Sequence, residues 1–197
     1  EGQTRLTGEP YIEHVFETAK TLAQLHMCAE SIAAGLLHDT LEDGRLSAED
    51  LKKEFGEGIF FLINGVTKLG KLKYRGLERH TESLRKLFVA TAEDARVLII
   101  RLADRLHNVR TLAGHASPEK RARIAIETLE IFVPLADRLG MGHLRGEMED
   151  YAFPYAYPEE YKKVTELLKQ KSKLNQQYLE KIHRSLSKKL AEQGHTH

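Results

Sequence analysis

The fold is decided by the stretch Leu36-Leu37-His38-Asp39-Thr40-Leu41-Glu42-Asp43. The small and apolar residues around its start predict a buried helix over residues 32–41. In such surroundings a histidine beside an aspartate is costly unless both side chains are paired or bound to a cation. The His38-Asp39 doublet is therefore a candidate for metal binding.

Two further carboxylates, Glu42 and Asp43, follow the doublet. Residues four apart share one face of a helix, so we expect Glu42 to lie on the face of His38. Asp43 should lie on the face of Asp39 for the same reason. The doublet can then hold a cation while the second pair reaches past it, as a hydrolytic metal site requires.

Two residues elsewhere in the chain would complete the metal shell, His14 upstream and Asp104 downstream. Asp104 is surrounded by apolar residues, and a carboxylate on an apolar helix face needs a partner. A salt bridge to Arg101 or Arg105 on the same helix would also provide one, and this alternative stays open. Isolated histidines are read as ordinary polar residues; these are His26, His80, His115 and His143.

The apolar spacing is helical nearly everywhere and predicts an all-α fold. We expect helices over residues 12–23, 32–41, 47–56, 59–66, 96–109 and 118–132, and a long charged helix over 158–192. A capping box from Ser47 to Asp50 and the Ser117-Pro118 pair mark two of the helix starts. The β-branched run 96–101 could be a buried strand, but its apolar pattern continues for longer than a typical strand, which favours a helix.

The composition limits the class of protein. With 197 residues, 41% hydrophobic and 30% charged, the chain can form one compact domain, which we expect to carry a C-terminal extension. Its 30 basic and 29 acidic side chains leave a net charge of +1, which argues against a general nucleic-acid or membrane surface. The single cysteine, the lack of a long apolar run and the missing signal sequence predict a cytoplasmic protein, and the chain ends predict a fragment of a longer one.

One basic segment, residues 68–79, breaks the helical pattern. It contains two glycines among its cations, which are Lys68, Lys71, Lys73, Arg75 and Arg79. This composition predicts a mobile loop. A solvated surface loop and a lid that contacts phosphate are both compatible with it.

The order of His14, the His38-Asp39 doublet and Asp104 resembles the H…HD…D pattern of the HD-domain phosphohydrolases. Flanking segments narrow the resemblance to the hydrolase domain of the RelA/SpoT homologues, which degrade the alarmones ppGpp and pppGpp; they are residues 5–14, 38–43, 65–69 and 102–112. Further segments resemble the link to the synthetase of the bifunctional members, namely 128–130, 134–140 and 158–161. The resemblance implies an HD-domain helical bundle over 1–157 and a helical extension over 158–197.

The resemblance also implies roles for single residues. It makes one set the ligands of a manganese ion, namely His14, His38, Asp39 and Asp104. It makes Glu42 and Asp43 the catalytic carboxylates, and it places Arg5, Asn108 and Thr111 in the nucleotide pocket. The mixed nitrogen and oxygen shell independently suits manganese or iron better than a closed zinc site. Leu6 stands where a lysine is common in the family, so one basic contact near the nucleotide is expected to be missing.

The implied reaction is manganese-dependent removal of the 3′-pyrophosphate from ppGpp or pppGpp, which leaves GDP or GTP. The substrate is then a small guanine nucleotide, and we expect no nucleic acid or membrane as a partner of this fragment. Two alternatives remain: an HD-type phosphohydrolase of another nucleotide, and a non-catalytic module that binds guanine nucleotide. The second would need a damaged active site, and none is visible in the sequence.

Overall fold

A computed structural model describes residues 4, 8, 10–70 and 94–192 of the chain. Within these residues the regular structure is helical, apart from one isolated bridge between Thr4 and Pro10, and the predicted all-α class is confirmed. The helices are α1 (Tyr11–Gln24), α2 (Ala29–Leu37), α3 (Ala48–Gly70), α5 (Ala95–Arg110), α6 (Pro118–Glu127), α7 (Val133–Arg138), α8 (Gly142–Ala156) and α9 (Pro158–Glu192). A 3₁₀ turn, η1 (Leu112–Gly114), follows α5, and a π-helical turn, η2 (Thr128–Phe132), connects α6 to α7.

Side-chain caps explain where several helices begin. The Ser47 hydroxyl accepts a hydrogen bond from the backbone N–H of Asp50 at 3.1 Å, as the capping box predicts. The Ser117 hydroxyl accepts from the backbone N–H of Lys120 at 3.2 Å and starts α6. Residues 96–101 lie in α5, so the helix interpretation of this run is confirmed and the strand alternative is wrong.

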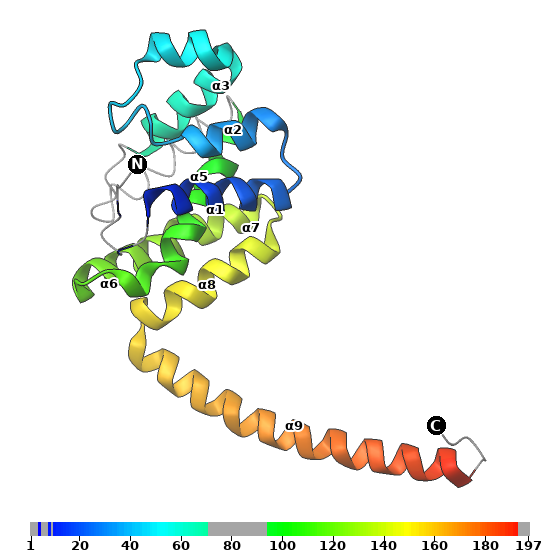
Figure 1. Cartoon of the computed structure of the whole chain (residues 1–197). Helices are drawn as coiled ribbons and strands as arrows, with labels where there is room; N and C mark the ends of the chain where they lie inside the picture. Colours follow the sequence, from blue (N-terminus) through cyan, green and yellow to red (C-terminus); the bar gives the residue numbers. More distant parts are fainter. Residues whose placement is uncertain (1–3, 5–7, 9, 71–93, 193–197) are drawn as a thin grey trace. The chain divides into compact units, whose positions relative to one another are not determined.

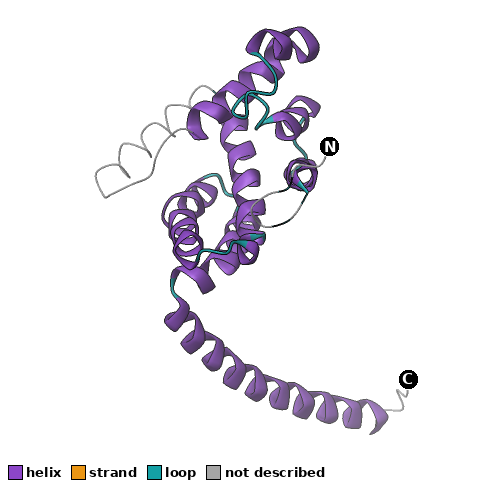
Figure 2. Cartoon of the chain, turned by 60° about the vertical axis from the view of Figure 1, so that its left-hand side comes forward, coloured by secondary structure: helices purple, strands orange, loops and turns teal. Residues whose placement is uncertain are grey.

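Helix α5 forms the centre of the bundle (Figures 1 and 2). It packs against α1, α2, α3 and α8. Its apolar residues Leu98, Ile100 and Leu102 are buried in the main core. Each such side chain contributes about 1.5–3 kcal/mol when it is fully removed from water. The helix that carries Asp104 is thus held on several sides before any ligand binds.

Helix α2 ends earlier than the sequence predicted. It stops at Leu37, and residues 38–44 form turns rather than the last part of a helix over 32–41. The cause is local, because both the hydroxyl and the backbone N–H of Thr40 donate to the Leu37 carbonyl, at 2.6 and 3.0 Å. A hydrogen bond with the α-helical spacing of four residues crosses the turn, from the N–H of Asp43 to the Asp39 carbonyl at 2.9 Å. Glu42 and Asp43 therefore lie on a turn, and the expectation that they share helix faces with His38 and Asp39 is wrong.

Two other boundaries involve glycines. Gly56 has a φ of +85° and breaks α3 into the two helical parts that the sequence predicted on either side of it. Lys68 and Gly70 lie in the last turn of α3, so the prediction of a loop beginning at Lys68 is wrong for these residues. The rest of the basic segment, residues 71–79, lies outside the described residues.

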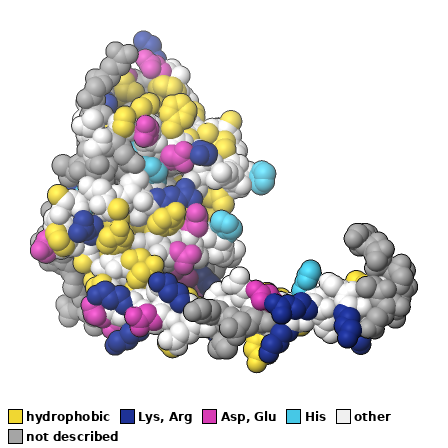
Figure 3. Space-filling view, turned by 60° about the horizontal axis from the view of Figure 1, so that its bottom comes forward, with side chains coloured by type: hydrophobic (Ala, Val, Ile, Leu, Met, Phe, Trp, Pro, Cys, Tyr) yellow, Lys and Arg dark blue, Asp and Glu magenta, His cyan; other side chains and the backbone are white. Residues whose placement is uncertain are grey.

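The chain divides into two compact units, Glu1–Ala156 and Tyr157–His197. The second unit contains α9, whose apolar stripe is exposed, including Leu167, Tyr178 and Ile182. The assignment of residues 1–157 to an HD phosphohydrolase domain and of residues 158–197 to a helical extension stays a prediction. In the first unit, acidic and basic side chains are interspersed on the face seen in Figure 3, in keeping with the small net charge. Among the described helices, none has the length and apolar character needed to cross a membrane.

Candidate metal centre

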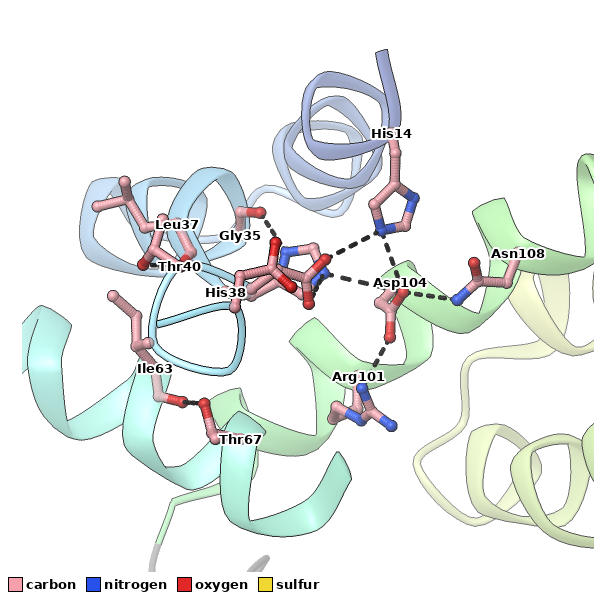
Figure 4. Close-up of polar contacts among 12 residues, drawn as sticks. His14, Gly35, Leu37, His38, Thr40, Ile63, Thr67, Arg101, Asp104 and Asn108 are labelled. Carbon is pink, nitrogen blue, oxygen red and sulfur yellow. Dashed lines mark hydrogen bonds and ion pairs between the residues drawn. The ribbon is translucent and has the colours of Figure 1, made fainter. Parts of the chain in front are cut away.

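Side chains from three helical segments converge beside a cavity of about 510 Å³ (Figure 4). His14 comes from the first turns of α1, and Asp104 from the middle of α5. The His38-Asp39 doublet comes from the end of α2. The structure therefore brings all four expected ligands to one place, although they are distant in the sequence.

His38 is held in the orientation that a metal ligand needs. Its Nδ1 lies 2.8 Å from the Gly35 carbonyl oxygen, so Nδ1 carries the proton and donates. The opposite nitrogen, Nε2, is buried and makes no hydrogen bond within the described structure, although Asp39 Oδ1 lies 3.2 Å away. A buried polar atom without a hydrogen bond is costly, and a metal ion on this lone pair would remove the cost. The donor set therefore fits a metal.

Gly35 also lets α2 approach α1 closely. A Cβ atom at this position would clash with Leu22 Cδ1 and would lie 3.7 Å from the Ala19 Cα, both in α1. Leu22 is fully buried, so it has little room to move away. The absence of a side chain at Gly35 thus brings the helix of His38 next to the helix of His14.

His14 faces the same point from α1. Its Nε2 lies 3.7 Å from Asp39 Oδ2 and 3.4 Å from Asp104 Oδ1. One ligand atom each from His14, His38 and Asp39 can be chosen so that all three lie within 4.8 Å of one another. Ligands about 2 Å from one ion lie at most about 4 Å from each other. The nitrogen–oxygen distances between the two imidazoles and the two carboxylates, 3.2 to 3.8 Å, are within this limit.

Asp104 makes both of the contacts that the sequence left as alternatives. Its Oδ2 accepts from Arg101 Nη1 at 2.8 Å, which is the helix salt bridge. Its Oδ1 lies 3.4 Å from His14 Nε2 and 3.8 Å from His38 Nε2. Because the two oxygens point in different directions, the salt bridge leaves one oxygen for the metal cluster.

The electrostatics of the cluster favour a bound cation. Burial opposes a charge on His38, but the nearby carboxylates of Asp39 and Asp104 outweigh it and raise the pKa of His38 to about 9. Burial also opposes the charge on Asp104, but His14 and Arg101 keep the pKa of this carboxyl well below its usual range. Burial likewise opposes the charge on Asp39, but the adjacent His38 outweighs it and lowers the pKa of Asp39. Asp39 and Asp104 thus remain ionised in a largely buried site, where positive charge is strongly stabilised.

Tyr11 supports Asp39 from the first turn of α1. Its hydroxyl donates to Asp39 Oδ2. Burial, reinforced by the adjacent Asp39 carboxylate, raises the pKa of Tyr11, so the phenol stays protonated and remains a donor. The guanidinium of Arg45 lies 5.4 Å from the centre of the Tyr11 ring. Tyr11 therefore fixes one oxygen of a candidate ligand.

The Glu42-Asp43 pair lies at the same cavity but is exposed. Asp43 Oδ2 lies 3.4 Å from Arg45 Nε. An ideal Cβ on Gly70 would lie 3.1 Å from Glu42 Oε2 and 3.7 Å from Arg101 Nη1. The end of α3 thus passes close to Glu42 and Arg101. Both carboxylates can reach a molecule in the cavity without leaving the turn that carries them.

The three residues expected to contact the nucleotide have different positions. Arg5 lies outside the described residues. Asn108 lines the cavity, and its Nδ2 donates to Asp104 Oδ1 at 2.7 Å. Thr111 is not among the described residues that line this cavity, and its hydroxyl donates to the His107 carbonyl within α5 at 3.0 Å.

The structure adds residues that sequence reasoning did not select. His107 contacts His14, with 2.9 Å between their Nδ1 atoms. The cavity is also lined by Arg105 from α5, Lys120 from α6 and His115, which precedes α6 and was read as an ordinary polar residue. A signal for His107 was present, because positions 104, 107, 108 and 111 follow the three-to-four spacing of one helix face and all carry polar side chains.

This geometry agrees with the comparison to protein families. A family model described as an HD domain matches residues 1–142 of the chain. The chain therefore belongs to the HD-domain family.

The relatives are more specific. A protein of Aquifex aeolicus (strain VF5), named guanosine-3′,5′-bis(diphosphate) 3′-pyrophosphohydrolase, is 51% identical over 179 residues, which cover 91% of this chain and 25% of that protein. The bifunctional (p)ppGpp synthase/hydrolase SpoT of Escherichia coli (strain K12) is 43% identical over 195 residues, which cover 98% of this chain and 28% of that protein. The chain thus spans about a quarter of the length of these curated relatives.

A solved structure is similar as well. It is described as a metazoan ortholog of SpoT that hydrolyzes ppGpp and plays a role in starvation responses. It matches with a TM-score of 0.56 and 26% sequence identity, and the match covers 73% of this chain and 80% of that chain. The resemblance to the RelA/SpoT homologues that the sequence motifs indicated is thereby confirmed.

Proposed function

We propose that this chain is a manganese-dependent hydrolase that removes the 3′-pyrophosphate of ppGpp and pppGpp and leaves GDP or GTP. The observation that carries the metal is the buried Nε2 of His38, which has no hydrogen bond within the described structure and faces three other candidate ligands. The names of the relatives at 43–51% identity support the substrate. We further propose that the protein acts in the cytoplasm, as part of a longer bifunctional enzyme.

The metal would be held by His14, His38, Asp39 and Asp104. When bound, a divalent cation supplies a Lewis acid for the phosphoryl group and lowers the pKa of water. Two imidazoles and two carboxylates leave coordination positions open, which suits manganese better than a closed zinc site.

Glu42 and Asp43 would carry out the proton transfers. They are exposed at the cavity that the ligand cluster borders, so either can lie beside a water molecule and the reacting phosphate. One would deprotonate or position the water, and the other would manage the proton of the leaving oxygen. The proposal assigns these roles to the two carboxylates as a pair, because their order along the chain does not distinguish acid from base.

The cations around the cavity would bind the phosphates. Arg101 is paired with Asp104, and Arg105 with Glu127 at 3.0 Å, so both guanidinium groups are held in place near the site. Lys120 lines the side of the cavity formed by α6. A chain with a net charge of +1 has no broad positive field, so local cations of this kind must meet the charge of a nucleotide with two diphosphates. We propose that Arg5, Asn108 and Thr111 contribute to the same nucleotide pocket.

The test is a substrate panel with defined metal. The chain is stripped with a chelator, reloaded with Mn²⁺, and assayed for pyrophosphate release from ppGpp and pppGpp. A deoxynucleoside triphosphate, a cyclic dinucleotide and NADPH serve as competing substrates. We expect release from the alarmones that stops when the chelator returns. Preferential turnover of another nucleotide would overturn the assignment of the alarmones as substrate. Alarmone binding without any turnover would favour the non-catalytic alternative.

A further inference from the structure

His107 lies beside the metal cluster without belonging to it. It stands one turn after Asp104 on α5, is 5% exposed, and points its Nδ1 at His14. The two Nδ1 atoms are 2.9 Å apart, and the rings lie with their centroids 4.9 Å apart. We propose that His107 is a positioning residue whose Nδ1 accepts a hydrogen bond from the Nδ1–H of His14, which keeps the lone pair of His14 Nε2 directed at the metal site. This inference rests on the metal site of the proposed function.

The direction of the hydrogen bond follows from the two nitrogens of His14. Its Nε2 faces the two candidate carboxylate ligands, at 3.7 Å from Asp39 Oδ2 and 3.4 Å from Asp104 Oδ1. A ligating imidazole offers a lone pair to the metal and keeps its proton on the other nitrogen. His14 Nδ1 is then the donor, and His107 Nδ1 must be the acceptor. The proton of neutral His107 consequently lies on its own Nε2.

The same arrangement occurs at His38, which makes the assignment stronger. There the Nδ1–H donates a hydrogen bond to the Gly35 carbonyl at 2.8 Å, and Nε2 faces the other candidate ligands. Both candidate imidazole ligands are therefore held by a hydrogen bond at Nδ1, and both direct Nε2 at the metal site. The acceptor for His38 is a backbone atom, whereas the acceptor for His14 is a side chain that can be replaced.

Simple filling of the core does not account for this contact. His14 and His107 are both buried, at 2% and 5% exposure, so an apolar residue at position 107 could occupy the space. It would leave the Nδ1–H of His14 without this acceptor, and the ring could turn away from the cluster. Outer partners of this kind usually change metal affinity by about 10–100-fold when they are removed.

The experiment measures Mn²⁺ binding to the metal-stripped chain by electron paramagnetic resonance of free Mn²⁺, with the melting temperature of the metal-free chain as a second measurement. His107→Leu should weaken Mn²⁺ binding by about 10–100-fold. His107→Asn places an amide oxygen near the position of Nδ1 and should restore most of the affinity. His107→Gln carries the same group one bond further out and should not. The exposed His143→Leu is the matched control and should bind as the unchanged chain does.

The variants separate this inference from the proposed function. If the unchanged chain binds no Mn²⁺, the metal site itself is wrong. If it binds Mn²⁺ and His107→Leu binds equally well, the metal site stands and the role of His107 is overturned. If the affinities of the Asn and Gln variants follow only their melting temperatures, His107 acts on stability and not on the orientation of His14. Rescue by Asn but not Gln, at similar melting temperatures, would support the proposal.

Discussion

The ligand cluster and the Glu42-Asp43 pair border one cavity, but the protein holds them in opposite ways. His14, His38 and Asp104 are buried, and each has at least one fixed partner inside the fold. The carboxylates of Glu42 and Asp43 are exposed on a turn. The difference fits a division of tasks, because a metal site needs fixed geometry whereas proton transfer needs access to water and substrate. Substitutions in each region test whether the two tasks are separate.

The largest effect is expected from removing a buried ligand. Asp104→Ala takes away the oxygen that faces both imidazoles and leaves Arg101 without its salt bridge. The variant should retain no Mn²⁺ after gel filtration and should show no turnover, while circular dichroism still reports a helical protein. Asp137→Ala, which removes a surface partner of Arg145, is the control. Full activity of Asp104→Ala at stoichiometric metal would contradict the ligand assignment.

An intermediate effect is expected from the exposed pair. The double variant Glu42→Gln and Asp43→Asn keeps the shape of both side chains but removes their capacity to take a proton. Metal content and alarmone binding should be retained, while kcat falls by about 10²–10⁴-fold for each group. Calorimetric titration with Mn²⁺ and single-turnover kinetics separate the two quantities. Loss of Mn²⁺ together with activity would mean that the two regions are not separate.

The smallest effect is expected at the edge of the cavity. Lys120→Ala removes a cation that lines the α6 side and is expected to raise KM for ppGpp a few-fold with little change in kcat. The dependence of KM on ionic strength should become flatter, because a partly exposed charge is screened by salt. Lys169→Ala, on exposed α9, is the matched control. If KM and its dependence on ionic strength are both unchanged, Lys120 does not bind phosphate, and the metal and the arginines must do so.

The sequence predicted the helices better than it predicted the details of the site. Caps and apolar periodicity located the starts of α3 and α6, since Ser47 and Ser117 act within one turn of the chain. The predicted end of α2 was wrong because the hydroxyl of Thr40 donates to the Leu37 carbonyl and competes with the backbone hydrogen bonds that would continue the helix. Such competition depends on a rotamer and not on periodicity.

The candidate site shows the same limit. Residue type and apolar context selected His38, Asp39 and Asp104, whereas His14 was supported by its place in the pattern that the family resemblance supplies. The contact between His14 and His107 could not be predicted, because it joins α1 to α5 and depends on how the two helices pack. The roles of Glu42, Asp43, Asn108 and Thr111 stay predictions, since a cavity lining does not establish what a residue does to a substrate.

The close approach at Gly35 has a consequence for how mutations would spread through this domain. His14 lies on α1, and His38 directly follows α2; the separation of these two helices is set where Leu22 fills the space beside Gly35. A single methyl group at position 35 would act as a wedge, pushing apart two backbones and, with them, the two imidazoles. The distance between the two imidazoles therefore depends partly on hydrophobic packing. A substitution that touches no ligand can change this distance and weaken metal binding.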